Sequence, residues 1–213
     1  ATEAKELIGD NFLKSTSKNG SIYALPQYGT KGDVNALIIR KDIVDELKLP
    51  VDELKEAENF EEYIKNLDLL SVIFKQIYNA HPELVLVPSS QNPASFRVTE
   101  IPFTDTLGDG IGALMIGDNS KIQNMYESNE FMTLAKYMYQ WNQDGFILED
   151  AMTTQESGLT YLKNGRAFAF FEPAGNETNV EIGYKKSTGY EVVCKRLTKA
   201  FVTTNKVNNS AFG

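Results

Sequence analysis

The clearest hydrophobic pattern in the chain lies between residues 59 and 81. Apolar side chains recur there every three or four positions, which places them on one face of a helix. Asn59 with Glu62 three residues later is typical of a helix start, and His81 with Pro82 is typical of a helix end. The sequence therefore predicts a long amphipathic helix. Its apolar positions are Tyr63, Leu67, Leu70, Phe74, Ile77 and Tyr78.

Two apolar runs that lack polar alternation predict strands buried on both faces, as at the centre of an α/β sheet. The first covers residues 34–39, and the second covers residues 84–87 and is expected to end at Pro88. After the first run, Asp42 is the predicted N-cap of a short helix that continues to Leu47.

The second half of the chain continues the alternation of helices and strands. Apolar runs at 113–116 and 121–126 with turn residues between them predict a hairpin. Asn129 is the predicted N-cap of a second amphipathic helix, and Gly145 is the expected stop. The apolar face of this helix comprises Phe131, Leu134, Ala135, Met138 and Trp141. Further expected elements are a helix at 155–163, strands at 167–171 and 190–194, and a short helix between these two strands. This order predicts an α/β fold.

Composition excludes several classes of function. The formal net charge of −8 over 213 residues argues against a nucleic-acid or anionic-membrane partner. No apolar run is long enough to cross a bilayer. With one cysteine and one histidine, an internal disulfide and a His/Cys metal site are both excluded, and no metal or cofactor is expected. Cys194 follows two valines and is expected to be a buried structural thiol. Because the chain begins at Ala1 without a signal sequence, it is expected to be part of a longer protein.

Common catalytic motifs are absent from the sequence. No GxSxG, phosphate-binding loop or GxGxxG motif occurs, and His81 at a helix end is expected to be a surface histidine rather than a catalytic base. A glycosidase needs only two carboxylates, so the residues alone leave that class open. Glu172, at the expected end of an apolar strand, is the most conspicuous acid. Its role could be ligand contact, helix capping or catalysis.

Sugar binding uses flat aromatic faces and planar polar groups on loops at strand ends. Residues 28–33, 91–104 and 171–176 supply both kinds of side chain. Core packing is the competing interpretation for their phenylalanines. The candidate ligand-binding residues are Tyr28, Lys31, Asp33, Gln91, Asn92, Phe96, Arg97, Phe103, Phe171, Glu172 and Asn176.

Several segments together resemble a known family. Residues 19–26 read NGSIYALP, residues 37–42 read LIIRKD, residues 137–154 read YMYQWNQDGFILEDAMTT, and residues 159–175 read LTYLKNGRAFAFFEPAG. In this order they resemble family 1 extracellular solute-binding proteins, the sugar-binding subunits of ABC importers. The first segment is similar to the stretch that ends the first lobe of these proteins, and the second to the stretch that opens the second lobe.

The resemblance implies a type II periplasmic-binding-protein lobe, with a mixed sheet flanked by helices. Residues 1–26 would end lobe one, residues 27–205 would form lobe two, and residues 206–213 would start the return crossing. It further implies a non-enzymatic protein that captures a carbohydrate, most simply an oligosaccharide, between two hinged lobes and delivers it to an ABC permease. The fuller members of this family are usually lipid-anchored on the outer face of Gram-positive membranes, so the resemblance implies an extracellular location with any membrane contact made through a lipid anchor outside this chain.

One departure from the family affects the ligand. Maltose-binding relatives carry a tryptophan in the loop where this chain has Glu172, Pro173, Ala174 and Gly175. The identity of the sugar is therefore not carried over, and binding of a peptide or another solute stays open. A carboxylate-dependent glycan hydrolase and a surface interaction module also stay open as functions.

Overall fold

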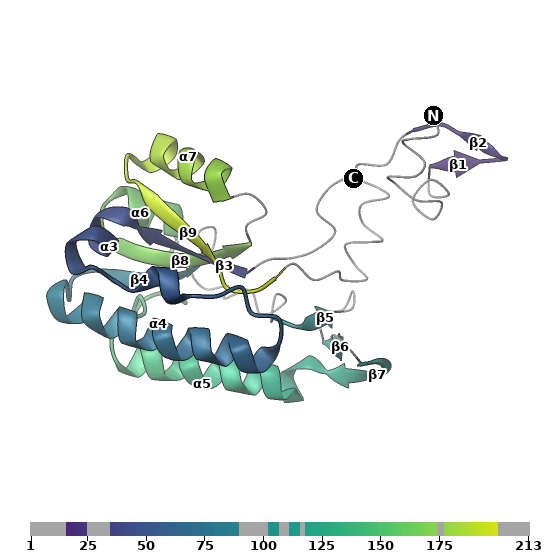
Figure 1. Ribbon diagram of the computed structural model, residues 1–213, viewed down its shortest axis with the longest axis horizontal. Coiled ribbons are helices and arrows are strands. Elements are labelled where there is room, and N and C mark those ends of the chain that lie inside the picture. Colours follow the sequence, from purple (N-terminus) through teal and green to yellow (C-terminus); the bar gives the residue numbers. More distant parts are fainter. Residues whose placement is uncertain are drawn as a thin grey trace.

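A four-stranded mixed sheet between two layers of helices forms the centre of the computed structural model (Figure 1). The structure describes residues 16–24, 35–89, 102–106, 111–115, 118–173 and 177–199. The strand order is β4-β8-β3-β9, with β4 parallel to β8 and the other two pairs antiparallel. The strands are β3 (Asn35–Arg40), β4 (Val85–Ser89), β8 (Ala167–Pro173) and β9 (Val192–Arg196). This architecture confirms the predicted α/β fold class.

Strand β3 is buried on both faces, as its unbroken apolar run predicted. Residues 36–39 are 0% exposed. Leu37 and Ile39 belong to the core on one side of the sheet, and Ala36 and Ile38 belong to the core on the other side. The central position of β3 follows from this double burial.

Helices α4 (Phe60–Ala80) and α5 (Asn129–Gln143) cover one face of the sheet (Figure 1). The Asn59 side chain accepts a hydrogen bond from the Glu62 amide, as predicted, while the Glu62 carboxylate accepts one from the Glu58 amide. Five of the six predicted apolar positions of α4 are buried, and the sixth, Tyr78, is half-buried. Short 3-10 helices, η1 (Val51–Glu53) and η3 (Met125–Glu127), precede α4 and α5 in the chain.

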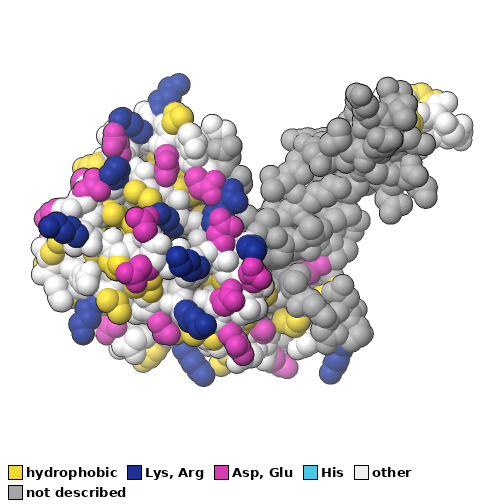
Figure 2. Space-filling view, viewed as in Figure 1, with side chains coloured by type: hydrophobic (Ala, Val, Ile, Leu, Met, Phe, Trp, Pro, Cys, Tyr) yellow, Lys and Arg dark blue, Asp and Glu magenta, His cyan; other side chains and the backbone are white. Residues whose placement is uncertain are grey.

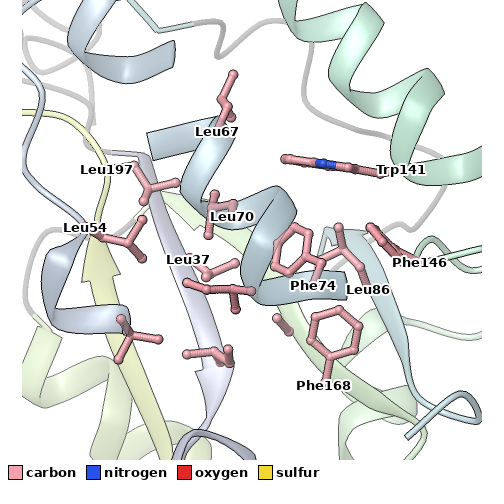
Figure 3. Close-up of a cluster of buried hydrophobic side chains, with 14 of the residues drawn as sticks. Leu37, Leu54, Leu67, Leu70, Phe74, Leu86, Trp141, Phe146, Phe168 and Leu197 are labelled. Carbon is pink, nitrogen blue, oxygen red and sulfur yellow. The ribbon is translucent and has the colours of Figure 1, made fainter. Parts of the chain in front are cut away.

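The aromatic side chains between α4, α5 and the sheet form one packed group (Figure 3). The Phe74 ring lies 5.0 Å from the ring of Trp141, edge to face, and 5.4 Å from the ring of Phe168. Phe146 completes the contact, with its centroid 6.5 Å from that of Phe74. Such pairs add to the hydrophobic stabilisation of the buried surface.

Helices α6 (Gly158–Lys163) and α7 (Glu177–Thr188) lie on the opposite side of the sheet (Figure 1). The core there contains Phe170, Leu162 and Cys194. Cys194 is free and buried, as predicted. Burial, reinforced by the carboxylates of Glu177 and Glu181, raises the pKa of its thiol to about 12.

Two isolated parallel bridges lie at the margins of the sheet. Ala57 pairs with Thr198 beside β9, and Leu86 of β4 pairs with Ile147.

The remaining strands form two small antiparallel sheets. β5 (Thr104–Thr106), β6 (Gly112–Met115) and β7 (Asp118–Asn124) form the first, in which β6 and β7 are the predicted hairpin and β7 begins earlier than expected. β1 (Ser17–Lys18) and β2 (Ser21–Ile22) form the second. Asn19 and Gly20 between them have φ of 51° and 80°, which is typical of an Asn-Gly hairpin turn.

Two predicted helix caps are wrong. The side chain of Ser128, not Asn129, caps α5 by accepting from the Phe131 amide. Asp42 does not cap α3 (Lys41–Leu47), because β3 continues to Arg40 and the helix begins one residue before Asp42. Asp42 instead accepts hydrogen bonds from the Arg40 guanidinium.

Several element ends also differ from their predictions. Pro88 lies within β4 rather than closing it, which is tolerated because β4 is the outer strand of the sheet on that side. Helix α6 starts at Gly158, after a cap by Ser157, rather than near residue 155. β9 starts and ends two residues later than expected and so includes Arg196.

The aromatic packing predicts a large stability cost for Phe74→Ala. Removing this fully buried ring leaves a cavity beneath α4, and we expect the free energy of unfolding to fall by about 3–5 kcal/mol. Urea denaturation measures the change. Val72→Ala is the matched control on the same helix, because Val72 is 52% exposed. It should change stability by less than about 0.5 kcal/mol, and equal losses in both variants would contradict the described core.

The raised pKa of Cys194 predicts slow alkylation of its thiol in the folded protein at pH 8. Unfolding in urea returns the pKa to about 8.5 and restores the reactive thiolate. We therefore expect labelling of the Cys194 peptide by iodoacetamide to be at least about 100-fold slower without urea. Mass spectrometry of the peptide measures both rates. Similar rates in the two conditions would show that the thiol is not buried.

Candidate functional site

Four strand termini meet at one end of the four-stranded sheet. Because β3 runs antiparallel to both β8 and β9, and β4 runs parallel to β8, the strands β4, β8 and β9 end where β3 begins. Asn35 at the start of β3 pairs with Pro173 at the end of β8, and Ser89 at the end of β4 pairs with Phe171. We refer to this edge as the convergent end of the sheet.

The three passages that were predicted to bind ligand all adjoin the convergent end in sequence. Residues 28–33 precede β3, residues 91–104 follow β4, and residues 171–176 include the end of β8. Sheet topology therefore brings together the points at which these passages attach. Most of the individual candidates, however, lie outside the described residues. These are Tyr28, Lys31, Asp33, Gln91, Asn92, Phe96, Arg97 and Asn176.

Phe171 is half-buried at the convergent end, on the side of the sheet that α4 and α5 cover. Its ring stacks on Trp141, with an interplanar angle of 5° and 6.2 Å between centroids. Trp141 is 1% exposed, and its indole N–H donates to the Ser71 hydroxyl at 2.7 Å. The orientation of the Phe171 ring is thus fixed by stacking on Trp141, whose own position is fixed by packing and a hydrogen bond. The apolar pattern placed Trp141 in the core but could not show this stack.

Phe103 is half-buried against the same core and has an unusual backbone conformation. Its φ of 65° lies in the left-handed region, which is uncommon for a bulky side chain. Thr104 and Asp105 follow it and are both buried. Backbone strain of this kind is found preferentially at functional sites, where the surrounding structure enforces it.

Glu172 lies on the opposite face of β8 from Phe171, toward α7. The Tyr184 hydroxyl of α7 donates a hydrogen bond to its carboxylate. Glu172 is half-buried, so this bond links the convergent end of β8 to the helix that covers it. Its position at the strand end is as predicted, and its partner could not be read from the sequence.

Arg196 is a polar residue of the convergent end that the sequence prediction missed. The register places both Glu172 and Arg196 opposite Ala36, one on each neighbouring strand. Arg196 forms an ion pair with Glu177 at the start of α7. It was missed because β9 was expected to end at Cys194, which would have left Arg196 in a loop.

The described residues offer hydrogen-bonding and stacking groups rather than a metal site. Within the described ranges, no group of three or more His, Cys, Asp or Glu side chains could hold a metal ion. His81 is half-buried beside Glu46 and Glu83 at the end of α4. None of the described helices combines the length and apolar character needed to cross a membrane.

Comparison with known proteins gives matches in structure only. No protein-family model matches the sequence, and no curated protein matches it. Among solved structures, the N-glycan transport solute binding protein NgtS from Streptococcus pneumoniae, in complex with Man1GlcNAc, has a TM-score of 0.65 and 16% sequence identity. The match covers 98% of this chain and 43% of NgtS.

Two further structures match more distantly. The ABC transporter associated binding protein from B. animalis subsp. lactis Bl-04, in complex with beta-1,6-galactobiose, has a TM-score of 0.50 at 15% identity. That match covers 96% of this chain and 46% of the B. animalis protein. The GacH receptor of Streptomyces glaucescens also has a TM-score of 0.50, at 12% identity, covering 90% of this chain and 42% of the receptor.

The chain thus spans less than half the length of each of these proteins. At these identities the likeness concerns the fold. The described part of the chain has the mixed α/β fold found in solute-binding proteins of ABC transporters, which is the fold that the sequence resemblance predicted.

Proposed function

We propose that this chain forms most of one lobe of a two-lobed solute-binding protein, which captures a carbohydrate for an ABC importer. The convergent end of the sheet is the observation that carries the proposal. It gathers the attachment points of three passages rich in aromatic and polar side chains, and ligands of α/β folds bind at such strand ends.

The path of the chain supports a two-lobed arrangement. The chain enters the sheet at the start of β3 and leaves it at the end of β9, and these strands are hydrogen-bonded neighbours (Figure 1). Two adjacent crossings toward a second body are what a hinged pair of lobes requires. In this proposal residues 1–26 end lobe one, residues 27–205 form lobe two, and residues 206–213 begin the return.

The proposed ligand class follows from the chemistry of the described side chains. Phe171 is half-buried and stacks on Trp141, so the exposed part of its ring is available for contact with the apolar face of a sugar. Glu172 and Arg196 offer charged hydrogen-bonding groups on the other face of the sheet. Two of the structures with the same fold hold carbohydrates, which are Man1GlcNAc in NgtS and beta-1,6-galactobiose in the B. animalis protein.

The proposed partner in the cell is an ABC permease, which receives the solute after capture. An extracellular location and attachment through a lipid outside this chain complete the proposal. Acidic and basic side chains are interspersed over the described surface in Figure 2. This distribution is suited to an aqueous surface rather than to binding an anionic polymer.

Ligand binding is best tested by thermal unfolding of the intact protein in the presence of defined oligosaccharides. The panel should include mannose-containing N-glycans and β-1,6-galactobiose, with dipeptides as a separate set. A ligand at 100 times its dissociation constant adds about 2.7 kcal/mol of stability, or several degrees in Tm. We expect one sugar to raise Tm and to be recovered intact by chromatography.

Two outcomes would overturn the proposal. Cleavage of the stabilising sugar would identify a glycan hydrolase, in which carboxylates such as Glu172 would act. Stabilisation by peptides and by no sugar at millimolar concentration would replace the carbohydrate with another solute.

Phe171→Ala should weaken binding of the stabilising sugar by about 10- to 100-fold, which is about 1.4–2.8 kcal/mol of binding free energy. Isothermal titration measures the change. Tyr78→Ala is the control, because Tyr78 is also a half-buried aromatic residue packed on the same core and lies near the C-terminal end of α4. It should lower Tm and leave affinity unchanged. Equal affinities of the Phe171→Ala variant and the unmodified protein would remove Phe171 from the ligand site.

A further inference from the structure

The segment by which the chain leaves the sheet is bonded to the residues that precede α4. We refer to residues 195–199 as the exit segment. The Ala57 amide donates to the Leu197 carbonyl at 3.1 Å, and the Lys199 amide donates to the Ala57 carbonyl at 2.9 Å. These bonds form the parallel bridge between Ala57 and Thr198 and continue the pairing beyond β9.

A single side chain of α4 joins the same two segments. Asn66 is 4% exposed, and its amide group donates to the Lys55 carbonyl at 2.7 Å and to the Leu197 carbonyl at 3.0 Å. Its side-chain oxygen accepts from the Lys55 amide at 3.1 Å. Asn66 therefore serves three backbone groups from two parts of the chain. Loss of the side chain would remove all three bonds, and the Leu197 carbonyl, in a residue that is 0% exposed, would lose a hydrogen bond that water cannot readily replace, which is costly.

Ion pairs at the surface flank these buried contacts. Lys195 pairs with Asp52, and Lys199 pairs with Glu58. The lysine in each pair donates a hydrogen bond that lowers the pKa of the carboxyl group. Both carboxylates are exposed, so each pair contributes modestly by itself. Their positions nevertheless place an attractive contact at each end of the exit segment.

We propose that Asn66 is a positioning residue that makes the exit segment part of the rigid body of this lobe. The inference rests on the proposed two-lobed function, in which the lobes rotate relative to each other when ligand binds. Bending within residues 195–199 would break the backbone bonds to Ala57 and the bond from Asn66 to the Leu197 carbonyl together. The exit segment therefore keeps its direction during closure. The hydrogen bonds of Asn66 fix the direction in which the chain leaves this lobe toward the second lobe.

Amide hydrogen exchange of the intact protein, without ligand, tests whether the exit segment is rigid. We expect the amides of Ala57 and Lys199 to be protected as strongly as that of Ile38 in β3. In Asn66→Ala, protection of Ala57 and Lys199 should fall at least about tenfold more than that of Ile38, because a local opening replaces global unfolding as the route of exchange. Fast exchange of Lys199 in the unmodified protein would overturn the inference.

Ile77→Ala is the matched control, because Ile77 is a buried residue of α4 that belongs to the core and lies about three turns away from Asn66. It should lower protection of Ile38, Ala57 and Lys199 by similar factors. The same uniform loss in Asn66→Ala would show that Asn66 acts only as a core residue. Glu58→Gln serves if Asn66→Ala does not fold, and it should reduce protection of Lys199 by roughly two- to fivefold with no change at Ile38.

The proposed role of Asn66 in closure is tested with the sugar that stabilises the intact protein. Asn66→Ala should weaken its binding by roughly tenfold more than Ile77→Ala does, although Asn66 is buried within the lobe. Equal affinities of the two variants would remove Asn66 from any role in closure. If no sugar binds, the proposed function fails while the exchange measurement still decides whether the exit segment is rigid.

Discussion

Burial of β3 on both faces is the constraint on which the rest of the structure depends. Its apolar side chains alternate between two cores, so helices must cover both sides of the sheet. The long helices α4 and α5 bring the larger aromatic core to one side, and the shorter α6 and α7 close the other. A sheet that is covered on both faces leaves its strand ends as the natural place for a ligand.

The direction of β3 determines which ends meet. Because it is antiparallel to the strands on either side, its beginning lies beside the ends of β8 and β9. The same direction places the entry and exit of the chain next to each other. In the proposed function, one strand orientation places both the ligand site and the pair of crossings at one edge, so that movement of a second lobe acts directly on the groups that contact the solute.

The sequence was most informative where a single element decides the outcome. The start and end of α4 and the double burial of β3 could be read directly from cap residues and apolar spacing. Where neighbouring residues compete to cap a helix, hydrogen bonds that the apolar pattern does not report decided the outcome. Asn129 is a good cap residue, but Ser128 also donates its hydroxyl to the Met125 carbonyl and so fixes the turn before the helix.

The contacts of Arg40 explain why the predicted capping role of Asp42 was wrong. The Arg40 side chain is held by the Gly165 carbonyl at 3.2 Å and lies 4.2 Å from the centroid of the Tyr190 ring, so the strand continues to Arg40 before the helix begins. No local pattern reports contacts with residues so distant in sequence. The candidate site divides similarly, because spacing identified the position of Phe171 and Glu172 at a strand end, whereas Trp141 and Tyr184 became their partners only through packing.

Asn66 shows most clearly how distant contacts decide the role of a side chain. Its position three residues after Tyr63 lies on the apolar face of α4, where an unpaired amide would be destabilising. Its partners are the backbone groups of Lys55 and of Leu197, the latter 131 residues away. A buried polar side chain in this place exchanges some hydrophobic stabilisation for a specific geometry, because only one arrangement of the two segments satisfies all three hydrogen bonds. In the proposed two-lobed protein, that specificity would keep the direction of the exit segment fixed while the lobe moves as a whole.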